Sequence, residues 1–193
     1  MATASAGAYY LTLPNNNASP LPSTTNLKDG AYVNYTVRTY ENEAITSEYP
    51  ITWIVSEGTY NGTDCWVIKV TADINVENST TTTLIYWYMN KTTYECISMK
   101  TQTYVDDVLV SEDESKYGSP PAVVDPQTIV GQETITVPAG TFTCDKVVVT
   151  DATTGIVTNL WYSTDVPIVG LVKMETYEGT QLTSARELIA YSR

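Results

Sequence analysis

Apolar and polar residues alternate one by one along most of the chain, and this alternation limits the possible fold more than any other feature. In the clearest stretch, Trp66 to Val76, every second residue is apolar and most residues between them are polar. Successive side chains of a β-strand point to opposite faces, so such a stretch has one dry face and one wet face. Residues 31–38 and 49–55 repeat the pattern. No apolar stripe with helical spacing is sustained, and we therefore expect an all-β chain that forms an antiparallel sheet with at most a minor helix.

Turn signals divide the chain into about eleven strands. Asn61-Gly62 suits a two-residue type I′ turn, because both central residues of that turn need a positive φ. Residues 138–140, Pro-Ala-Gly, suit a three-residue loop. Three prolines interrupt the pattern between residues 117 and 127. This segment predicts a crossover or a short helical turn between two halves of the chain.

The chain has 193 residues and no histidine, and its 10 basic and 22 acidic residues give a net charge of −12. A chain of this length suits a single domain. Without histidine it can build neither a Ser-His-Asp triad nor a His-ligated metal centre. The negative charge argues against nucleic acid as a partner, because phosphate contacts need clustered Lys and Arg. We expect no enzymatic activity, cofactor or metal ion, and no membrane-spanning helix, since no run of ~18 apolar residues occurs.

The composition favours an extracytoplasmic protein of a prokaryotic cell envelope. The chain is rich in Thr, Tyr and Asn and poor in Lys, and it contains Asn-x-Ser/Thr sequons. These sequons are candidate glycosylation sites or accidental matches in a Thr-rich surface. They lie at Asn17, Asn34, Asn61, Asn78 and Asn90.

Residues 1–28 are predicted to be a polar, proline-punctuated linker outside the sheet. The first residues lack the charged start and the apolar middle of a secretion signal. We expect that a signal or lipid-anchor peptide is removed ahead of them and that the linker tethers the chain to a membrane surface. Residues 29–193 then form a single β domain, with halves at about 29–116 and 128–193.

The two halves carry similar motifs in the same order: a cysteine, a Trp-Tyr pair and a lysine-led strand. These positions are Cys65, Trp87-Tyr88 and Lys100 in the first half and Cys144, Trp161-Tyr162 and Lys173 in the second. A repeat of this length is too long for a solenoid unit. Either two similar β-meanders form one sheet, or Thr-rich strands resemble each other through composition alone.

The last third of the chain resembles a known family. Its ordered motifs are Val-Pro-Ala-Gly-Thr-Phe at 137–142, Trp161-Tyr162, Gly-Leu-Val-Lys at 170–173 and Glu187-Leu188. This order is similar to the V-P-A-G-T-F … W-Y … G-x-V-K … E-L pattern of TapB-like and related envelope proteins of unknown function, which have the LolA-like lipoprotein-carrier fold. The resemblance implies an unclosed antiparallel half-barrel with an apolar concave side, where LolA-like carriers hold acyl chains, and a small helical lid. Ile168-Val169 departs from the glycine that relatives often have there, so carrier activity is not implied.

An apolar sheet face must be covered, and the sequence offers almost no helix to cover it. Three solutions are open: closure of the sheet into a barrel or sandwich, a lid built from Tyr117–Gln127, or a bound apolar ligand. The first two are structural and the third is functional.

The cysteines and the acidic run have structural explanations. Cys65 and Cys96 are expected two strands apart, about 9 to 10 Å, whereas the Cα atoms of a disulfide lie within ~7 Å. Together with Cys144 they are expected to be free thiols packed as small apolar groups. The acidic residues between 106 and 114 form a solvated hairpin tip or collect hard cations, and the absence of the EF-hand ligand order favours the tip.

The aromatic residues are the best candidates for a binding site, with 15 Tyr and 4 Trp against a single Phe. Such rings suit half-buried positions on a binding surface, although core packing and cross-strand pairing use them equally well. The candidate ligand-binding residues are Trp53, Trp66, Trp87, Trp161, Tyr88 and Tyr162.

The leading hypothesis is a non-enzymatic envelope protein that binds an apolar small molecule or lipid on the concave face of its sheet. The alternative is a surface-displayed structural or adhesive β-domain that binds protein or glycan through exposed tyrosines. A hydrolase needs converging carboxylates in a cleft, and the spacing of the acidic residues does not indicate one.

Overall fold

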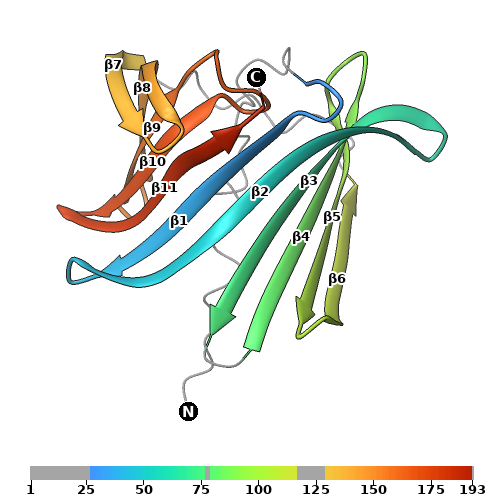
Figure 1. Ribbon diagram of the computed structural model, residues 1–193, viewed down its shortest axis with the longest axis horizontal. Helices are drawn as coiled ribbons and strands as arrows, with labels where there is room; N and C mark the ends of the chain where they lie inside the picture. The colour runs from blue at the N-terminus through green and yellow to red at the C-terminus, as the bar shows by residue number, and fades with distance from the viewer. Residues whose placement is uncertain (1–26, 77–78, 117–128, 193) are drawn as a thin grey trace.

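The computed structural model of the protein describes residues 27–76, 79–116 and 129–192, which form one antiparallel sheet of eleven strands (Figure 1). The predicted all-β fold and strand number are confirmed, and the open, curved sheet has the form of a half-barrel. The small helix that the resemblance implies does not occur in these ranges. The predicted lid, Tyr117–Gln127, and nearly all of the predicted linker lie outside the described residues.

The strands follow one another along the chain, and most of the described connections are short turns. They are β1 (Tyr32–Glu41), β2 (Ala44–Tyr60), β3 (Thr63–Val76), β4 (Ser79–Asn90), β5 (Cys96–Val105), β6 (Val108–Lys116), β7 (Ile129–Val137), β8 (Gly140–Thr150), β9 (Val157–Tyr162), β10 (Leu171–Glu178) and β11 (Gln181–Tyr191). Their order in the sheet is β6-β5-β4-β3-β2-β1-β11-β10-β9-β8-β7. We call β1–β6 the first meander and β7–β11 the second meander. The first and last strands join them, and the sheet stays open between β6 and β7.

The hairpin turns agree with the sequence at most positions and differ at two. Asn61 and Gly62 have φ values of 49° and 79°, as the predicted type I′ turn requires. Residues 138–140 do not form a three-residue loop, because Gly140 pairs with Val137 as the first residue of β8. The turn at Asn42-Glu43, with φ values of 49° and 65°, was not predicted, since glutamate rarely marks a turn with positive φ.

The apolar residues of the alternation form the core of the protein. On β1 the side chains of Val33, Tyr35 and Val37 are buried. Cross-strand partners share a face of an antiparallel sheet. Val33 pairs with Trp53 of β2 and Trp53 pairs with Val70 of β3, so the buried face continues across the strands. We call it the inner face, and the opposite side of the sheet the outer face.

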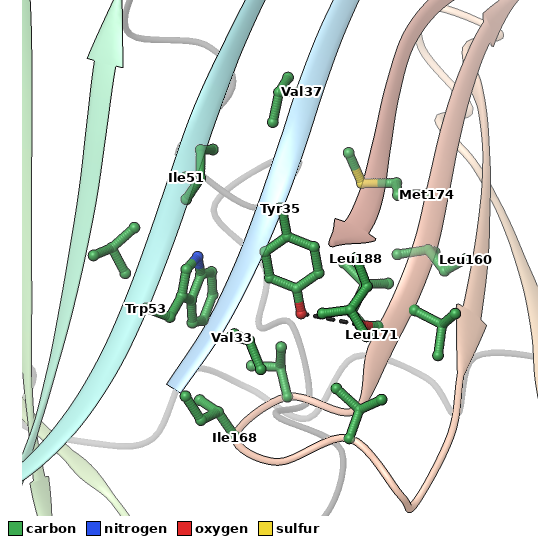
Figure 2. Close-up of a cluster of buried hydrophobic side chains, with 14 of the residues drawn as sticks. Val33, Tyr35, Val37, Ile51, Trp53, Leu160, Ile168, Leu171, Met174 and Leu188 are labelled. Atoms are coloured by element: carbon green, nitrogen blue, oxygen red, sulfur yellow. Dashed lines mark hydrogen bonds between the residues drawn. The ribbon is translucent and has the colours of Figure 1, made fainter. Parts of the chain in front are cut away.

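The second meander supplies its own cover at one end of this core. The β9–β10 loop places Val166, Ile168 and Val169 in buried positions, and Figure 2 shows Ile168 beside Val33 and Trp53. The hydroxyl of Tyr35 donates a hydrogen bond to the carbonyl oxygen of Leu171 at 3.0 Å, which links β1 to the start of β10 (Figure 2). The loop therefore belongs to the core and is not a solvated connection.

The end of the β7–β8 hairpin also bends back onto the sheet. The N–H of Ala139 donates to the carbonyl oxygen of Leu188 at 3.2 Å, and the rings of Phe142 and Tyr191 lie 5.8 Å apart. Strand β7 also contacts β10 and β11, which are not its neighbours in the sheet. Closure by the chain itself is thus the solution found at the second meander.

Candidate ligand-binding face

The sheet divides the six candidate residues between its two faces. Trp66 alternates with the buried Ile68 and Val70, and Trp53 and Trp87 pair with Val70 and Ile68, so these three tryptophans share the inner face. Tyr162 also lies on the inner face, in alternation with Leu160 of β9. Tyr88 and Trp161 lie on the outer face. The six residues therefore cannot line one site.

A one-residue difference in register explains this division. Trp87 pairs with Ile68, three residues after Cys65, whereas Trp161 pairs with Lys146, two residues after Cys144. A shift of one residue moves every side chain to the other face of a strand. The Trp-Tyr pairs of the two halves are similar in sequence but opposite in orientation.

The three inner-face tryptophans form a diagonal row across the first meander. Along β3 they occupy three successive inner-face positions, because Trp53 pairs with Val70, Trp87 pairs with Ile68, and Trp66 follows two residues earlier. These positions span about 13 Å of the strand direction. The rings of Trp53 and Trp87 meet edge to face, with centroids 5.1 Å apart and an interplanar angle of 76°. We call Trp53, Trp87 and Trp66 the tryptophan row.

Apolar side chains surround the tryptophan row. Ile68, Val70 and Ile85 are buried, and Met99 of β5 is partly buried against the same cluster. Toward the edge strand β6 the inner face becomes polar. There Thr83 of β4 pairs with Thr103 of β5. The described strands of this region make their main contacts with their neighbours in the sheet. The apolar part of the inner face thus ends within the first meander.

Two donors in the tryptophan row lack acceptors. The indole nitrogens of Trp53 and Trp66 are both buried, and neither has a hydrogen-bond partner. The ring of Trp66 has a charged neighbour, because the ammonium group of Lys91 lies 4.7 Å from the ring centroid. The same ammonium group forms an ion pair with the carboxylate of Glu57 at 2.9 Å. Buried N–H groups in proteins nearly always have an acceptor, so these two require an explanation.

The inner face of the second meander carries a buried cation that the sequence analysis did not single out. Arg186 of β11 is buried, pairs in register with Val37 and Met174, and holds its guanidinium carbon 5.9 Å from the ring centroid of Tyr35. Burial lowers the pKa of Arg186, while the tyrosines near it act in the opposite direction. Burial also raises the pKa of Tyr162 to about 12. The alternation of Ser184, Arg186 and Leu188 is the signal that places Arg186 inside.

Trp161 is held in a charged cluster on the outer face. Lys146 and Lys173 lie over its ring, 5.1 and 5.7 Å from the centroid. Its indole N–H donates to Glu133 at 2.8 Å, and Lys146 pairs with the same carboxylate at 2.9 Å. Lys146 and, secondarily, Trp161 lower the pKa of Glu133. The indole donor and the ring of Trp161 thus both have partners within the protein.

Tyr88 belongs to a second outer-face cluster in the first meander. Its ring lies 4.7 Å from that of Tyr60, whose hydroxyl donates to Glu114. Ser98 donates to the same carboxylate at 3.1 Å. Hydrogen bonds from Tyr60 and Ser98 lower the pKa of Glu114. Glu114 thus holds together three strands and is not free to bind a cation.

The cysteines lie apart, and all three are free thiols. Cys65 is on β3 and Cys96 on β5, the expected separation of two strands. Burial raises the pKa of Cys96 and of Cys144 to about 11. Reactive cysteines have lowered pKa values, so neither of these thiols has the character of a nucleophile.

Only the first two residues of the acidic run lie at the predicted hairpin tip, because Glu112, Asp113 and Glu114 lie within β6. Asp106 and Asp107 form the turn between β5 and β6, and Asp106 accepts hydrogen bonds from the hydroxyl of Ser79 and the N–H of Thr80. Glu112 pairs with Lys100 at 3.0 Å. In the part of the chain that the structure describes, no cluster of three metal-ligating side chains occurs.

Three of the five sequons lie in described parts of the chain. Asn61 is exposed at the β2–β3 turn. The side-chain oxygen of Asn90 accepts from the N–H groups of Thr92 and Thr93, while Asn34 lies within the central strand β1 with its side-chain oxygen buried. Asn17 and Asn78 lie outside the described residues. Of the three sequons in the described residues, the one at Asn61 has the most accessible side chain.

Across residues 27–76, 79–116 and 129–192, there is no helix with the length and apolar character needed to span a membrane.

Comparisons with known proteins give a partial match. A family model described as DUF3108-like matches residues 95–188, which include β5 and β6 and most of the second meander. Among solved structures, the chain is similar to a candidate exported protein with a YmcC-like fold from Bacteroides fragilis, with 14% identity, coverage of 86% of this chain and 97% of that chain, and a TM-score of 0.40. A TM-score this low carries no argument. No curated protein matches the chain, and the resemblance to TapB-like proteins stays a prediction.

Proposed function

We propose that the protein is a non-enzymatic, extracytoplasmic envelope protein that binds an apolar small molecule or lipid on the inner face of its first meander. The observation that carries the proposal is the tryptophan row, an aromatic set on the apolar inner face in which two buried indole donors have no acceptor. Ligand sites are concave and mostly apolar, with a few polar groups that orient the ligand. The inner face of β2–β4 has this composition.

The proposed location rests on composition and on the accessible sequon. Low Lys content, a net charge of −12 and an exposed Asn61 suit a protein outside the cytoplasm. Residues 1–28 serve as the tether in this proposal, and residues 29–193 as the ligand-binding domain. Mass spectrometry of the native protein tests both points. A cytoplasmic protein with an unmodified Asn61 and no anchored form contradicts them.

Neighbouring aromatic residues on opposite faces provide the test of ligand binding. Trp87 lies on the inner face and Tyr88 on the outer face of the same strand. The neutral probe N-phenyl-1-naphthylamine becomes fluorescent in apolar sites, and its affinity is measured for the wild type and for Trp87→Ala and Tyr88→Ala. We expect at least a tenfold loss of affinity in Trp87→Ala, about 1.4 kcal/mol of lost contact. Tyr88→Ala should bind like the wild type.

Equal affinities of the two variants contradict the proposed site. Native mass spectrometry of gently purified protein provides a second measurement that needs no variant, and we expect a bound apolar species. Absence of any bound species, combined with weak probe binding, leaves the adhesive β-domain as the better explanation. In that case, substitution of exposed tyrosines should abolish binding to protein or glycan.

A further inference from the structure

The two edge strands of the sheet differ in how the rest of the chain holds them. β7 contacts β10 and β11, and its Glu133 binds both Lys146 and Trp161. β6 pairs with β5 on one side and is the last strand of the sheet on the other. Eight of its nine residues are exposed. The outward N–H and C=O groups of β6 therefore form an open edge, to which another strand can add.

The start of β6 exposes three consecutive apolar side chains. Val108, Leu109 and Val110 are 64%, 47% and 58% exposed. Val108 pairs with Val105 on the inner face, Leu109 pairs with Tyr104 on the outer face, and a bulge leaves Val110 without a cross-strand partner. Edge strands are usually blunted by charges or proline, and residues 108–110 carry neither. This stretch has the apolar character of a strand with a neighbour on each side.

The second half of β6 is regular and acidic. Residues 111–116 pair one to one with β5, so Glu112 and Asp113 project from opposite faces of the strand. Glu112 accepts from β5 through its Oε2 atom. Asp113 is exposed, and its cross-strand partner is the uncharged Thr101. Both carboxylates can therefore receive a cation from the open side of the strand.

These charges decide which partner suits the edge. If two copies of the chain paired through the acidic half of β6, carboxylates would lie opposite carboxylates. Like charges directly opposite each other destabilise a pair of strands. The net charge of −12 on each copy adds to the repulsion. A strand with Lys or Arg at the matching positions turns the same contacts into attractions.

We propose that β6 is a docking edge for an extended, basic segment of a partner protein, which adds to the sheet as a further strand. Lys or Arg side chains of that segment lie opposite Glu112 and Asp113, and its apolar residues lie beside Val108, Leu109 and Val110. Main-chain hydrogen bonds supply affinity, and the side-chain pairs supply specificity. The inference does not depend on the proposed function, because β6 lies outside the tryptophan row.

A matched pair of synthetic peptides tests the proposal. Acetyl-TTTKKTVTV-amide is designed to run antiparallel to β6, with its lysines opposite Glu112 and Asp113 and its valines beside residues 108–110. Acetyl-TTTEETVTV-amide reverses the charges. Each peptide is titrated into the ¹⁵N-labelled full chain, and binding is followed by the amide resonances. We expect the basic peptide to bind at least about tenfold more tightly, because each reversed pair replaces an attraction with a repulsion.

Amide hydrogen exchange of the wild type locates the added strand. We expect the basic peptide, at saturation, to slow the exchange of the outward N–H groups of β6 at least about tenfold and to leave β7 unchanged. A version of this peptide with N-methyl groups on its five central residues keeps the charges and loses the main-chain donors. It should bind at least about tenfold more weakly.

Paired variants assign the charge preference to β6. The double variant Glu112→Gln, Asp113→Asn removes both charges, and we expect its preference for the basic peptide to fall to near parity. The double variant Glu41→Gln, Glu43→Gln is the matched control. It changes two exposed carboxylates at the β1–β2 turn by the same charge, and it should keep the preference.

Three results would overturn the proposal. The first is equal binding of the two peptides, and the second is protection that falls on β7 or on neither edge. The third is protection of β6 that rises with protein concentration in the absence of peptide, because a second copy of the chain would then occupy the edge. The peptide titrations and the exchange measurement use the wild-type chain, so they do not depend on the folding of any variant.

Discussion

The two meanders share one alternation of apolar and polar residues but complete their cores differently. In the second meander the β9–β10 loop and the β7–β8 hairpin end pack onto the core, with Ile168 and Phe142 buried. In the first meander the inner face presents Trp53 and Trp87 instead, and two buried indole donors remain without acceptors. The alternation thus decides which face is apolar, whereas the connections decide what covers it. The proposed function places the ligand at the first meander, where these two indole donors lie.

The largest expected effect concerns the hairpin that covers the second meander. Phe142→Ala removes a buried ring that packs against Tyr191, and we expect a loss of about 3 to 5 kcal/mol in the free energy of unfolding. Ile129→Ala on the same hairpin changes a side chain that is 60% exposed and should cost less than about 0.5 kcal/mol. Urea denaturation measures both. Similar losses in the two variants would show that the hairpin end is not a cover.

A second prediction uses the unusual backbone of the β9–β10 loop. Ile168 has a φ of 69°, a conformation in which a β-branched residue is strained, and its buried side chain holds it there. Ile168→Ala should cost about 2 to 4 kcal/mol, because it removes the packing and keeps the strain. Ile168→Gly relieves the strain and should be about 1 kcal/mol more stable than Ile168→Ala. Thermal denaturation of the two variants measures the difference. If Ile168→Gly is less stable than Ile168→Ala, the claim that the backbone at Ile168 is strained is contradicted.

The hydrogen bond between the two meanders gives a smaller effect. Tyr35→Phe removes the donor to the Leu171 carbonyl and should cost about 1 to 2 kcal/mol, because that carbonyl then loses its partner in the core. Tyr32→Phe, on the same strand but exposed, is the control and should change the unfolding free energy by less than about 0.5 kcal/mol. Equal stability of wild type and Tyr35→Phe would mean that the link does not stabilise the junction.

The smallest effect concerns the charged outer face of the second meander. Lys146, followed by Trp161, lowers the pKa of Glu133 in the folded state. The stabilisation is therefore fully present above the unfolded pKa of about 4.3 and is lost as the pH falls through the lower, folded value. We expect Glu133→Gln to be less stable than wild type at neutral pH and to lose less stability during acidification. Unfolding curves between neutral and acidic pH measure this, and parallel curves would refute the assignment.

The sequence predicted the fold well because the information is local. Period-two alternation identified Ile68, Val70 and Ala72 as inner-face residues, and the structure buries all three. Residue types at turns located most hairpins. The pairing of β1 with β11 was not predicted from the sequence. It depends on contacts between residues about 150 positions apart, such as Arg38 and Ala185.

The candidate site was predicted only in part, for two physical reasons. Similar motifs suggested equivalent Trp-Tyr pairs, but register is set by pairing along whole strands, and a one-residue difference placed Trp161 on the outer face. Arg186 was not singled out from the sequence, and the strand register turns it inward. Neither outcome follows from local composition.

The most direct test of the central claim is a map of where an apolar ligand contacts the chain. A fatty acyl methyl ester with a diazirine in its chain is bound to the protein, activated by light and located by peptide mass spectrometry. We expect labelling in β2–β4, at peptides that contain Trp53 and Trp87, with competition by methyl laurate. Labelling confined to the second meander, or labelling that methyl laurate does not reduce, would contradict the claim that the first meander receives the ligand.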